Sequence, residues 1–415
     1  MIALSVRRHA LGWLFAANTV GVLLAALLLW PEAGAWLGPL SYGRWMPLHL
    51  NWQLYGWCSL PLVGALLAWC LVDGHPRAAR HARVALGAWS LALALGGVSW
   101  LAAGSGGKLF LDWQGWARPL LPLAMIVLWT VVAAHGLFWQ RAGVARVVAL
   151  VGLLVVPSLL YWSAGREVYP AVNPDSGGAT GASLLGSTLG IVLVFGMLPA
   201  MLGVSRRPDA GVAPGRLFWT ALAGSFAVFG LLDRGNASHH AAGQIVGLGL
   251  LIAWVPLAWV YFRGFAWPMG AWRWLAAAFG WWALLVVTGW ITFLPGVSER
   301  LKFTDGLVAH AHLAMAGLVT AMGMVILHSL ASSPSAPAPK SNLMGYFWVW
   351  QGATLAHVAA LLVAGWAEST DAGGYFRGED WSRALYAGRL LAGGVMWAVS
   401  AAWLREAWRK GGGVT

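Results

Sequence analysis

Twelve runs of about 20 mostly apolar residues recur along the chain, and they limit its fold more than any other feature. Each run can cross the hydrocarbon core of a bilayer, which is roughly 30 Å thick. The connections between the runs are too short for a soluble domain. We therefore predict an all-α, polytopic membrane protein, with residues 1–415 forming a single membrane domain. The predicted spans are 11–30, 47–72, 83–103, 118–140, 144–164, 182–204, 216–233, 241–263, 271–294, 306–331, 343–366 and 384–405.

The composition supports this fold, because 59% of the residues are hydrophobic and only 10% are charged. A soluble protein of this length is far less apolar. A net charge of +12 would suggest a nucleic-acid partner if the chain were soluble. In a membrane protein the distribution of charge matters more than its sum. We therefore expect a lipid bilayer around the chain and no nucleic acid.

Lys and Arg residues gather on one face of the predicted membrane domain. Most of the 26 lie nearer the face that carries the N-terminus, and most of the 14 Asp and Glu residues lie nearer the other. We name these faces side A and side B. An excess of Lys and Arg marks the cytoplasmic face. The pattern predicts a multi-pass protein of a bacterial-type inner (cytoplasmic) membrane, with both termini and the Pro/Ser-rich linker 332–342, between spans ten and eleven, in the cytoplasm.

Three histidines lie inside predicted spans at a similar depth. His49 is near the start of the second span, and His310 and His312 are in the first third of the tenth. Even-numbered spans all run from side B to side A, so the three residues share the outer half of the membrane. Ionisable residues inside a membrane are costly and usually functional. Two histidines at one depth on different helices can bind a single haem iron from its two faces.

The spacing of His310 and His312 separates their side chains. Two residues along an α-helix give a rotation of about 200°, so the two imidazoles leave opposite faces of the helix. They cannot share one iron, but each can bind a different one. We interpret the tenth span as a helix between two haems. The remaining histidines have simpler interpretations: His9, His75, His81 and His328 lie at cytoplasmic ends or loops, and we expect His135 to have a packed or interfacial role. His357 could line the pocket of the second haem or pack against a neighbouring helix, and we favour packing.

The segments around these histidines resemble the catalytic subunit I of the haem-copper oxidase superfamily, and most closely the cbb3-type oxidases and the nitric oxide reductases. The segment FTDGLVAHAHLAMAGL (303–318) is similar to the cbb3-type tenth helix, in which F-T-D precedes the paired histidines. The segments GYFWVWQGATLAHVAALLVAG (345–365) and ALYAGRLLAGGVMWAVSAAWL (384–404) resemble the two helices that follow. The resemblance covers most of the chain.

This resemblance implies a set of haem ligands. His49 and His312 would be the axial ligands of a six-coordinate, low-spin haem b, and His310 would be the proximal ligand of a second haem. Membership of a respiratory electron-transport complex is also implied. Electrons would come from a c-type cytochrome, as a partner subunit or a soluble cytochrome c, and a small gas such as O2 or NO would bind at the second haem.

One part of the family pattern is missing. Members hold copper or non-haem iron beside the second haem, with one histidine from span six and an adjacent pair from the end of span seven. This chain has no histidine between His135 and His239, and alignment places Leu231 and Leu232 where the pair should be. Leucine cannot bind a metal. The sequence therefore argues against copper or non-haem iron at that position.

A histidine pair does follow nearby, at His239 and His240 in the segment RGNASHHAAGQ. If the loop after span seven were shortened, the pair could move into the metal-binding position. The ungapped spacing instead leaves it in a loop near the periplasmic surface, where it could contact a haem propionate or a partner subunit. Without the ligand from span six, the two histidines would form an incomplete site.

Three functions remain open from the sequence. The first is a two-haem subunit that transfers electrons from a c-type cytochrome through a low-spin haem to a second haem, and binds O2 or NO without a complete copper site. The second is a true terminal O2 or NO reductase with His239 and His240 in a metal site. The third is a haem-free transporter or assembly factor with the same fold. An enzyme of this kind would be an oxidoreductase of the cytochrome c oxidase or nitric oxide reductase class, and the sequence assigns no catalytic residue.

Overall fold

The structure is a computed structural model that describes residues 2–140, 143–331 and 346–409. Within these ranges it is helical and contains no β-strand. Twelve helical stretches are long and apolar enough to cross a membrane, which confirms the predicted all-α, multi-pass fold in a lipid bilayer. They are α1 (Ile2–Leu29), α2–η2–α3 (Tyr42–Cys70), α4 (Ala78–Leu101), η3–α5–η4 (Gly115–Phe138), α6 (Val144–Ser163), α7 (Gly181–Met201), α8 (Ala213–Leu232), α9 (Ala242–Phe262), α10 (Met269–Phe293), α12–η6–α13 (Asp305–Ala331), α14 (Phe347–Thr370) and α16 (Asp380–Arg409).

Several helices extend beyond the apolar runs that predict them. The first span is predicted from residue 11, yet α1 begins at Ile2 and includes Arg7 and Arg8. Hydropathy reports only the part of a helix that contacts lipid, whereas backbone hydrogen bonds continue the helix into the interface. There the charged side chains find partners: Arg7 Nη2 lies 3.7 Å from Glu406 Oε1, and Arg8 Nε donates to the backbone oxygen of Ala407 at 3.2 Å.

The chain forms two compact units, which are described separately below. Unit 1 consists of Met1–Tyr169, Ile326–Ala353 and Leu390–Thr415, and unit 2 of Pro170–Val325 and Thr354–Arg389. The expectation of a single membrane domain stays a prediction. The predicted linker 332–342 lies outside the described residues.

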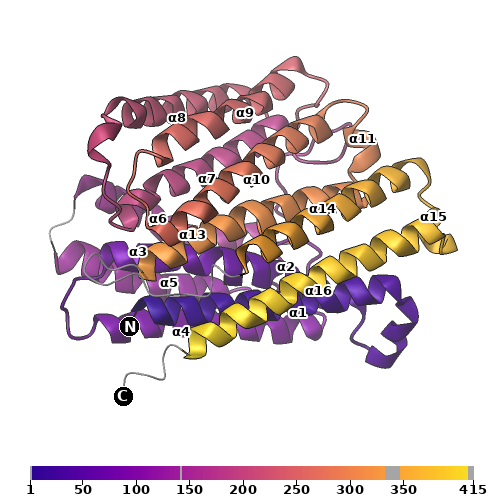
Figure 1. Cartoon of the computed structure of the whole chain (residues 1–415), viewed down its shortest axis with the longest axis horizontal. Coiled ribbons are helices and arrows are strands. Elements are labelled where there is room, and N and C mark those ends of the chain that lie inside the picture. The colour runs from indigo at the N-terminus through magenta and orange to yellow at the C-terminus, as the bar shows by residue number, and fades with distance from the viewer. Residues whose placement is uncertain (1, 141–142, 332–345, 410–415) are drawn as a thin grey trace. The chain divides into compact units, whose positions relative to one another are not determined.

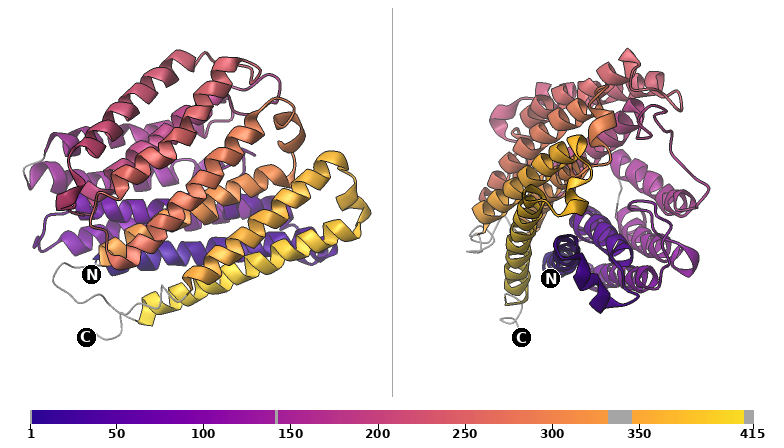
Figure 2. Two further views of the ribbon diagram at one scale, coloured as in Figure 1. Left: turned by 45° about the horizontal axis from the view of Figure 1, so that its top comes forward. Right: turned by 90° about the vertical axis from the view of Figure 1, so that its right-hand side faces the viewer.

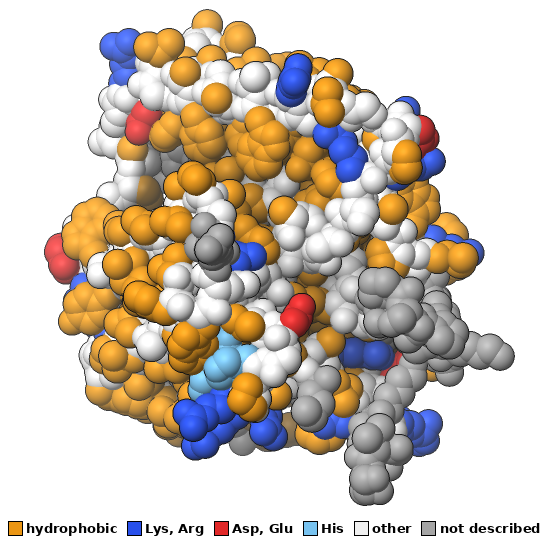
Figure 3. All heavy atoms as spheres, turned by 90° about the vertical axis from the view of Figure 1, so that its left-hand side faces the viewer, with side chains coloured by type: hydrophobic (Ala, Val, Ile, Leu, Met, Phe, Trp, Pro, Cys, Tyr) orange, Lys and Arg blue, Asp and Glu red, His pale blue; other side chains and the backbone are white. Residues whose placement is uncertain are grey.

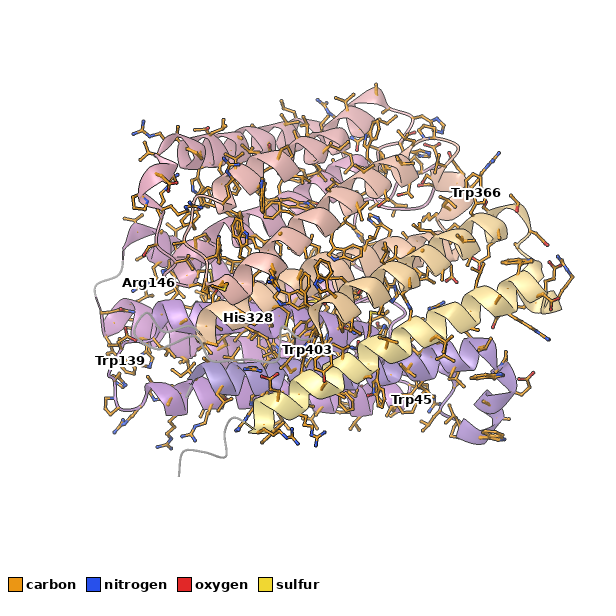
Figure 4. The ribbon with its side chains drawn as sticks, viewed as in Figure 1. Trp45, Trp139, Arg146, His328, Trp366 and Trp403 are labelled. Carbon is orange, nitrogen blue, oxygen red and sulfur yellow. The ribbon has the colours of Figure 1, made fainter. Side chains whose placement is uncertain are left out.

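In unit 1, α1 packs against α2, η2, α3 and α4, while α5 packs between α4 and α6 (Figure 1). The contacts of Arg7 and Arg8 bring the start of α1 and the end of α16 together. These two helix ends therefore share one side of the membrane, as the predicted topology requires. Trp45 and Trp139 lie toward opposite ends of this unit (Figure 4), consistent with a second span that starts at side B and a fourth that ends at side A.

In unit 2, α9 packs against α7, α8 and α10, and α10 packs against η6 (Leu313–Val319). Both views of Figure 2 show these magenta-to-orange helices side by side. Aromatic side chains fill the space between α8 and α9, where Phe218 stacks on Tyr261 with ring centroids 4.2 Å apart. The close packing of α9 and α10 fixes the position of the α10 face that meets the tenth span.

Three of the membrane helices contain a π-helical stretch. These are η2 (Trp52–Cys58), η4 (Ala134–Phe138) and η6 (Leu313–Val319). The first begins three residues after His49, the second contains His135, and the third begins directly after His312. π-Helical turns are rare and often occur at functional sites, because they change the direction of side chains along a helix.

Candidate functional site

His49 lies on α2 within unit 1, and its Nδ1 is 2.9 Å from the backbone oxygen of Ala17 on α1. A carbonyl oxygen can only accept a hydrogen bond, so Nδ1 carries the proton and Nε2 carries the lone pair of the neutral ring. Gly21, one turn further along α1, faces the same ring. A Cβ at that position would lie 2.7 Å from His49 Cε1. The glycine lets α1 pass directly against the imidazole.

His312 ends α12, and its Nδ1 is 2.8 Å from the backbone oxygen of Val308 one turn earlier. By the same reasoning its proton is on Nδ1 and its lone pair is on Nε2. The His312 ring lies against that of His357 on α14, with centroids 4.6 Å apart. His357 in turn donates from Nδ1 to the backbone oxygen of Arg389 at 3.1 Å. His357 therefore packs beside a candidate ligand.

His310 faces α10 instead of α14. Its Nδ1 is 3.4 Å from the hydroxyl oxygen of Thr288, whose own proton goes to the backbone oxygen of Leu284 at 2.7 Å. A Cβ on Gly289 would lie 2.7 Å from His310 Cε1, so α10 approaches this imidazole as closely as α1 approaches that of His49. His310 and His312 thus contact different helices, as their spacing predicts.

The three predicted haem ligands fall into both units. His49 belongs to unit 1, whereas His310 and His312 belong to unit 2. The local environment of each ring is therefore described, and a haem shared by His49 and His312 remains a prediction.

A group of charged side chains surrounds the start of α12, and the sequence reasoning did not predict it. Arg389 Nη1 lies 3.3 Å from Asp305 Oδ1, and the exposed fractions of these side chains are only 12% and 10%. The backbone N–H of Asp305 donates to Glu368 Oε2 at 2.7 Å, and the Tyr386 hydroxyl donates to Glu368 Oε1 at 3.1 Å. Arg389 therefore pairs with Asp305, while Glu368 joins the group through the Asp305 N–H and the Tyr386 hydroxyl.

Asp305 and Glu368 did not stand out in the sequence, because both lie just outside the predicted spans 306–331 and 343–366. The available signal was the acid of the F-T-D segment followed, two helices later, by the arginine of YAGRLL. Only the packing of α12, α14 and α16 within unit 2 brings the two segments together.

His239 and His240 lie in the loop before α9, and the structure places two carboxylates beside them. His239 is buried, and its Nε2 lies 2.8 Å from Glu299 Oε1. His240 Nε2 lies 3.5 Å from the same oxygen, and Asp175 Oδ2 lies 3.9 Å from His239 Nδ1. The histidine pair thus belongs to a group of loop residues on side B of unit 2.

Leu231 and Leu232, which the alignment puts in place of the family's histidine pair, are the last two residues of α8. Leu231 is 69% exposed, so it points away from the packed helices of unit 2. Leu232 packs against Gly247 of α9. The contact is so close that a Cβ added to this glycine would lie only 2.1 Å from Leu232 Cδ1. Both side chains are accounted for by packing or exposure.

A second histidine group lies at the side A end of unit 1, formed by residues that the sequence alone did not connect with one another. His81 Nδ1 is 3.0 Å from His135 Nε2, and the His75 ring is 4.9 Å from that of His135. Trp139 stacks on His75 with ring centroids 4.6 Å apart. Figure 3 shows histidine side chains beside several Lys and Arg side chains on one face. The topology contained the signal, since the loop after the second span and the end of the fourth span share side A.

No family model and no curated protein matches this chain. The all-α membrane fold stands on the chain's own helices. The likeness to haem-copper oxidases rests on the histidine segments described above and stays a prediction.

Proposed function

We propose that this chain is a haem-b-binding membrane subunit similar to subunit I of the haem-copper oxidases. It takes electrons from a c-type cytochrome and passes them through a low-spin haem to a second haem, where O2 or NO binds. One observation carries the proposal: in both His49 and His312 a backbone carbonyl accepts from Nδ1, which assigns the lone pair to Nε2. Metal-ligating histidines usually show this arrangement.

The local environment of the candidate ligands suits haem b. All three histidines lie in apolar helices, where a neutral imidazole is the favoured donor. Gly21 and Gly289 each face an imidazole at a distance that no other residue could keep without moving the ring. The rings are therefore held by close backbone packing, as preorganised ligands are.

Each residue has a distinct role in this proposal. His49 and His312 would hold the iron of the low-spin haem, and His310 would hold the iron of the second. Bound haem would supply one-electron chemistry and a place for a gas ligand. Ala17 and Val308 orient the first two imidazoles through their carbonyl oxygens, and Thr288 orients the third.

No second metal is included beside the second haem. α7 contains no histidine, and α8 ends in Leu231 and Leu232. Four-electron reduction of O2 would lack the partner metal that family members use. Gas binding, NO chemistry and electron transfer do not require it.

The proposed orientation follows from the charge pattern. The start of α1 and the end of α16 lie on one side, and that side is the cytoplasm by the excess of Lys and Arg. The haem ligands then lie in the periplasmic half of a bacterial-type inner membrane. A periplasmic c-type cytochrome can donate electrons over a short distance.

A pyridine haemochrome assay combined with metal analysis of the purified protein tests the proposal. We expect two haems per chain. The variants H49A and H312A should each lose the low-spin, six-coordinate spectrum, and H310A should lose only the second haem. The control H9Q changes a histidine whose Nδ1 instead lies 2.7 Å from the Ser90 hydroxyl, and it should keep both haems.

Two other results would replace the proposal. Copper or non-haem iron that couples magnetically to the second haem, and is lost with His239 or His240, would indicate a true terminal O2 or NO reductase. Colourless protein without haem would indicate a transporter or assembly factor.

A further inference from the structure

We propose that the side B loops of unit 2 bind a divalent transition-metal ion of the Zn²⁺ class, with His239, His240, Asp175 and Glu299 as its ligands. This site is separate from the haem ligands and does not depend on the proposed electron transfer. It joins three connections that are distant in the sequence: the loop before α7, the loop before α9, and α11 (Ser298–Leu301).

The candidate ligand atoms gather in one small region, with Asp175 on the Nδ1 side of His239 and Glu299 on its Nε2 side. One ligand atom each from Asp175, His239 and His240 fall within 4.8 Å of one another. Glu299 Oε1 lies 2.8 Å from His239 Nε2 and 3.5 Å from His240 Nε2. Bonds of about 2.0–2.2 Å in a tetrahedral site place neighbouring donors roughly 3.3–3.5 Å apart. Binding through His239 Nε2 requires its proton to move to Nδ1 and Glu299 Oε1, which now accepts that proton, to turn toward the ion.

The charge of this group suits a dication. Two carboxylate side chains lie beside the two imidazoles, and no Lys or Arg ion pair is recorded for either carboxylate among the described residues. The group formed by His75, His81 and His135 offers three imidazoles and no carboxylate. Arg77 and Arg80 act electrostatically on His81 there, and this positive field opposes a bound cation. Of the two groups, the one on side B is the better cation site.

The structure also supplies support behind the ligands. Asn173 is buried beside His239, and its side-chain amide reaches Nδ1 through either atom, with Nδ2 at 2.8 Å and Oδ1 at 3.1 Å. Its Oδ1 can accept the Nδ1 proton when Nε2 ligates a metal. Metal-binding histidines commonly donate their second ring N–H to such an oxygen.

The other ligands are open to solvent, which gives an ion a route of entry. The His240 side chain is 57% exposed, Asp175 39% and Glu299 36%, whereas His239 is fully buried. The site thus combines the buried His239 with three partly exposed ligands that an ion can reach from solvent. Mixed nitrogen and oxygen donors favour Zn²⁺ over Ca²⁺ and Mg²⁺, which prefer oxygen alone.

Isothermal titration of the chelator-treated, full-length protein with Zn²⁺ tests the site. We expect one Zn²⁺ per chain and a rise in Tm on binding. The exposed His240 can be changed without opening the interior, so H240Q should fold normally and bind Zn²⁺ at least tenfold more weakly. E299Q should weaken binding in the same way. Ca²⁺ should bind far more weakly than Zn²⁺ to the wild type.

The control is H81Q, which removes one histidine from the group in unit 1. It should bind Zn²⁺ as the wild type does. Equal binding by H240Q and the wild type, loss of binding in H81Q, or no saturable Zn²⁺ binding would each overturn the proposed site. Haem content, measured on the same samples, reports on the proposed function separately, since neither H240Q nor H81Q changes a haem ligand.

Discussion

His49 and His310 each have a glycine against the imidazole ring, and this contact places demands on single residues. At both positions a Cβ would come within 2.7 Å of Cε1 of the ring, closer than real Cβ contacts. The ring or the helix must move if a methyl group is added. The position of each imidazole therefore depends on one residue of a neighbouring helix as well as on its own.

The substitution G289A should displace His310 and reduce occupancy of the second haem, while the low-spin haem remains. The added methyl group meets the ring edge, and a ligand misplaced by about 1 Å binds its metal poorly. Optical spectra of the purified variant measure both haems. G280A is the matched control on the same helix, because nothing lies within 4 Å of a Cβ there. Equal loss of the second haem in both variants would contradict the role of this contact.

Asp112 shows the effect of burial on a loop carboxylate of unit 1. Burial raises its pKa above the ordinary value of 3.8, although Oδ1 accepts hydrogen bonds from the Ser105 hydroxyl at 2.7 Å and the Gly107 N–H at 3.1 Å. The folded protein therefore holds this proton to a higher pH than the unfolded chain does. The resulting stability is fully present below the unfolded pKa and is lost as pH rises through the folded pKa.

We therefore expect a pH dependence that D112N removes. Acidification from pH 7 toward 4 should stabilise the wild type relative to D112N. Only the wild type has a carboxylate at residue 112, and the folded state binds a proton there more tightly than the unfolded chain does. Thermal unfolding in detergent at a series of pH values measures the difference. Parallel curves for the two proteins would show that Asp112 does not titrate in this window.

At the scale of elements, the short helix α12 connects the acidic group to the histidines. Thr304 caps its start by accepting the N–H of Gly306 at 3.1 Å, and His312 ends it where η6 begins. The buried pair of Asp305 and Arg389 joins this helix to α16. Charges removed from water are tolerated only when they are paired. The ion pair therefore fixes the first turn of α12, one turn before His310.

Removing one member of this pair should be strongly destabilising. R389L leaves Asp305 without its paired cation, and breaking a buried pair costs about 3–5 kcal/mol. Unfolding in a denaturing detergent measures the loss. R383L, which changes an exposed arginine of the same helix, should cost far less. The double variant R389L/D305N should recover part of the loss, and a double variant less stable than R389L would contradict this explanation.

At the scale of the whole molecule, the arrangement of the chain across the membrane decides where each site can act. The start of α1 and the end of α16 lie together, whereas the group around His239 belongs to loops of side B. The proposed orientation follows from the sequence charge, because Lys and Arg favour the cytoplasm. The histidine group of unit 1 faces the cytoplasm in this orientation, and the proposed cation site faces the periplasm.

Reporter fusions test this orientation. A green fluorescent protein fused after the C-terminus should fluoresce, and alkaline phosphatase at the same position should be inactive, because the proposed orientation places that end in the cytoplasm. Alkaline phosphatase inserted between residues 165 and 180 should be active. The reverse pattern would place the haem ligands near the cytoplasm and exclude a periplasmic electron donor.

The sequence by itself determined the membrane fold, the approximate spans and the opposite directions of His310 and His312. These properties are local, since hydropathy and helical periodicity act over residues close in the chain. Only the tertiary structure brought Asp175, His239 and Glu299 together, or joined Asp305 to Glu368 and Arg389. Such groups form because helices far apart in sequence pack side by side, and that packing depends on the shapes of many side chains at once. No local pattern encodes it.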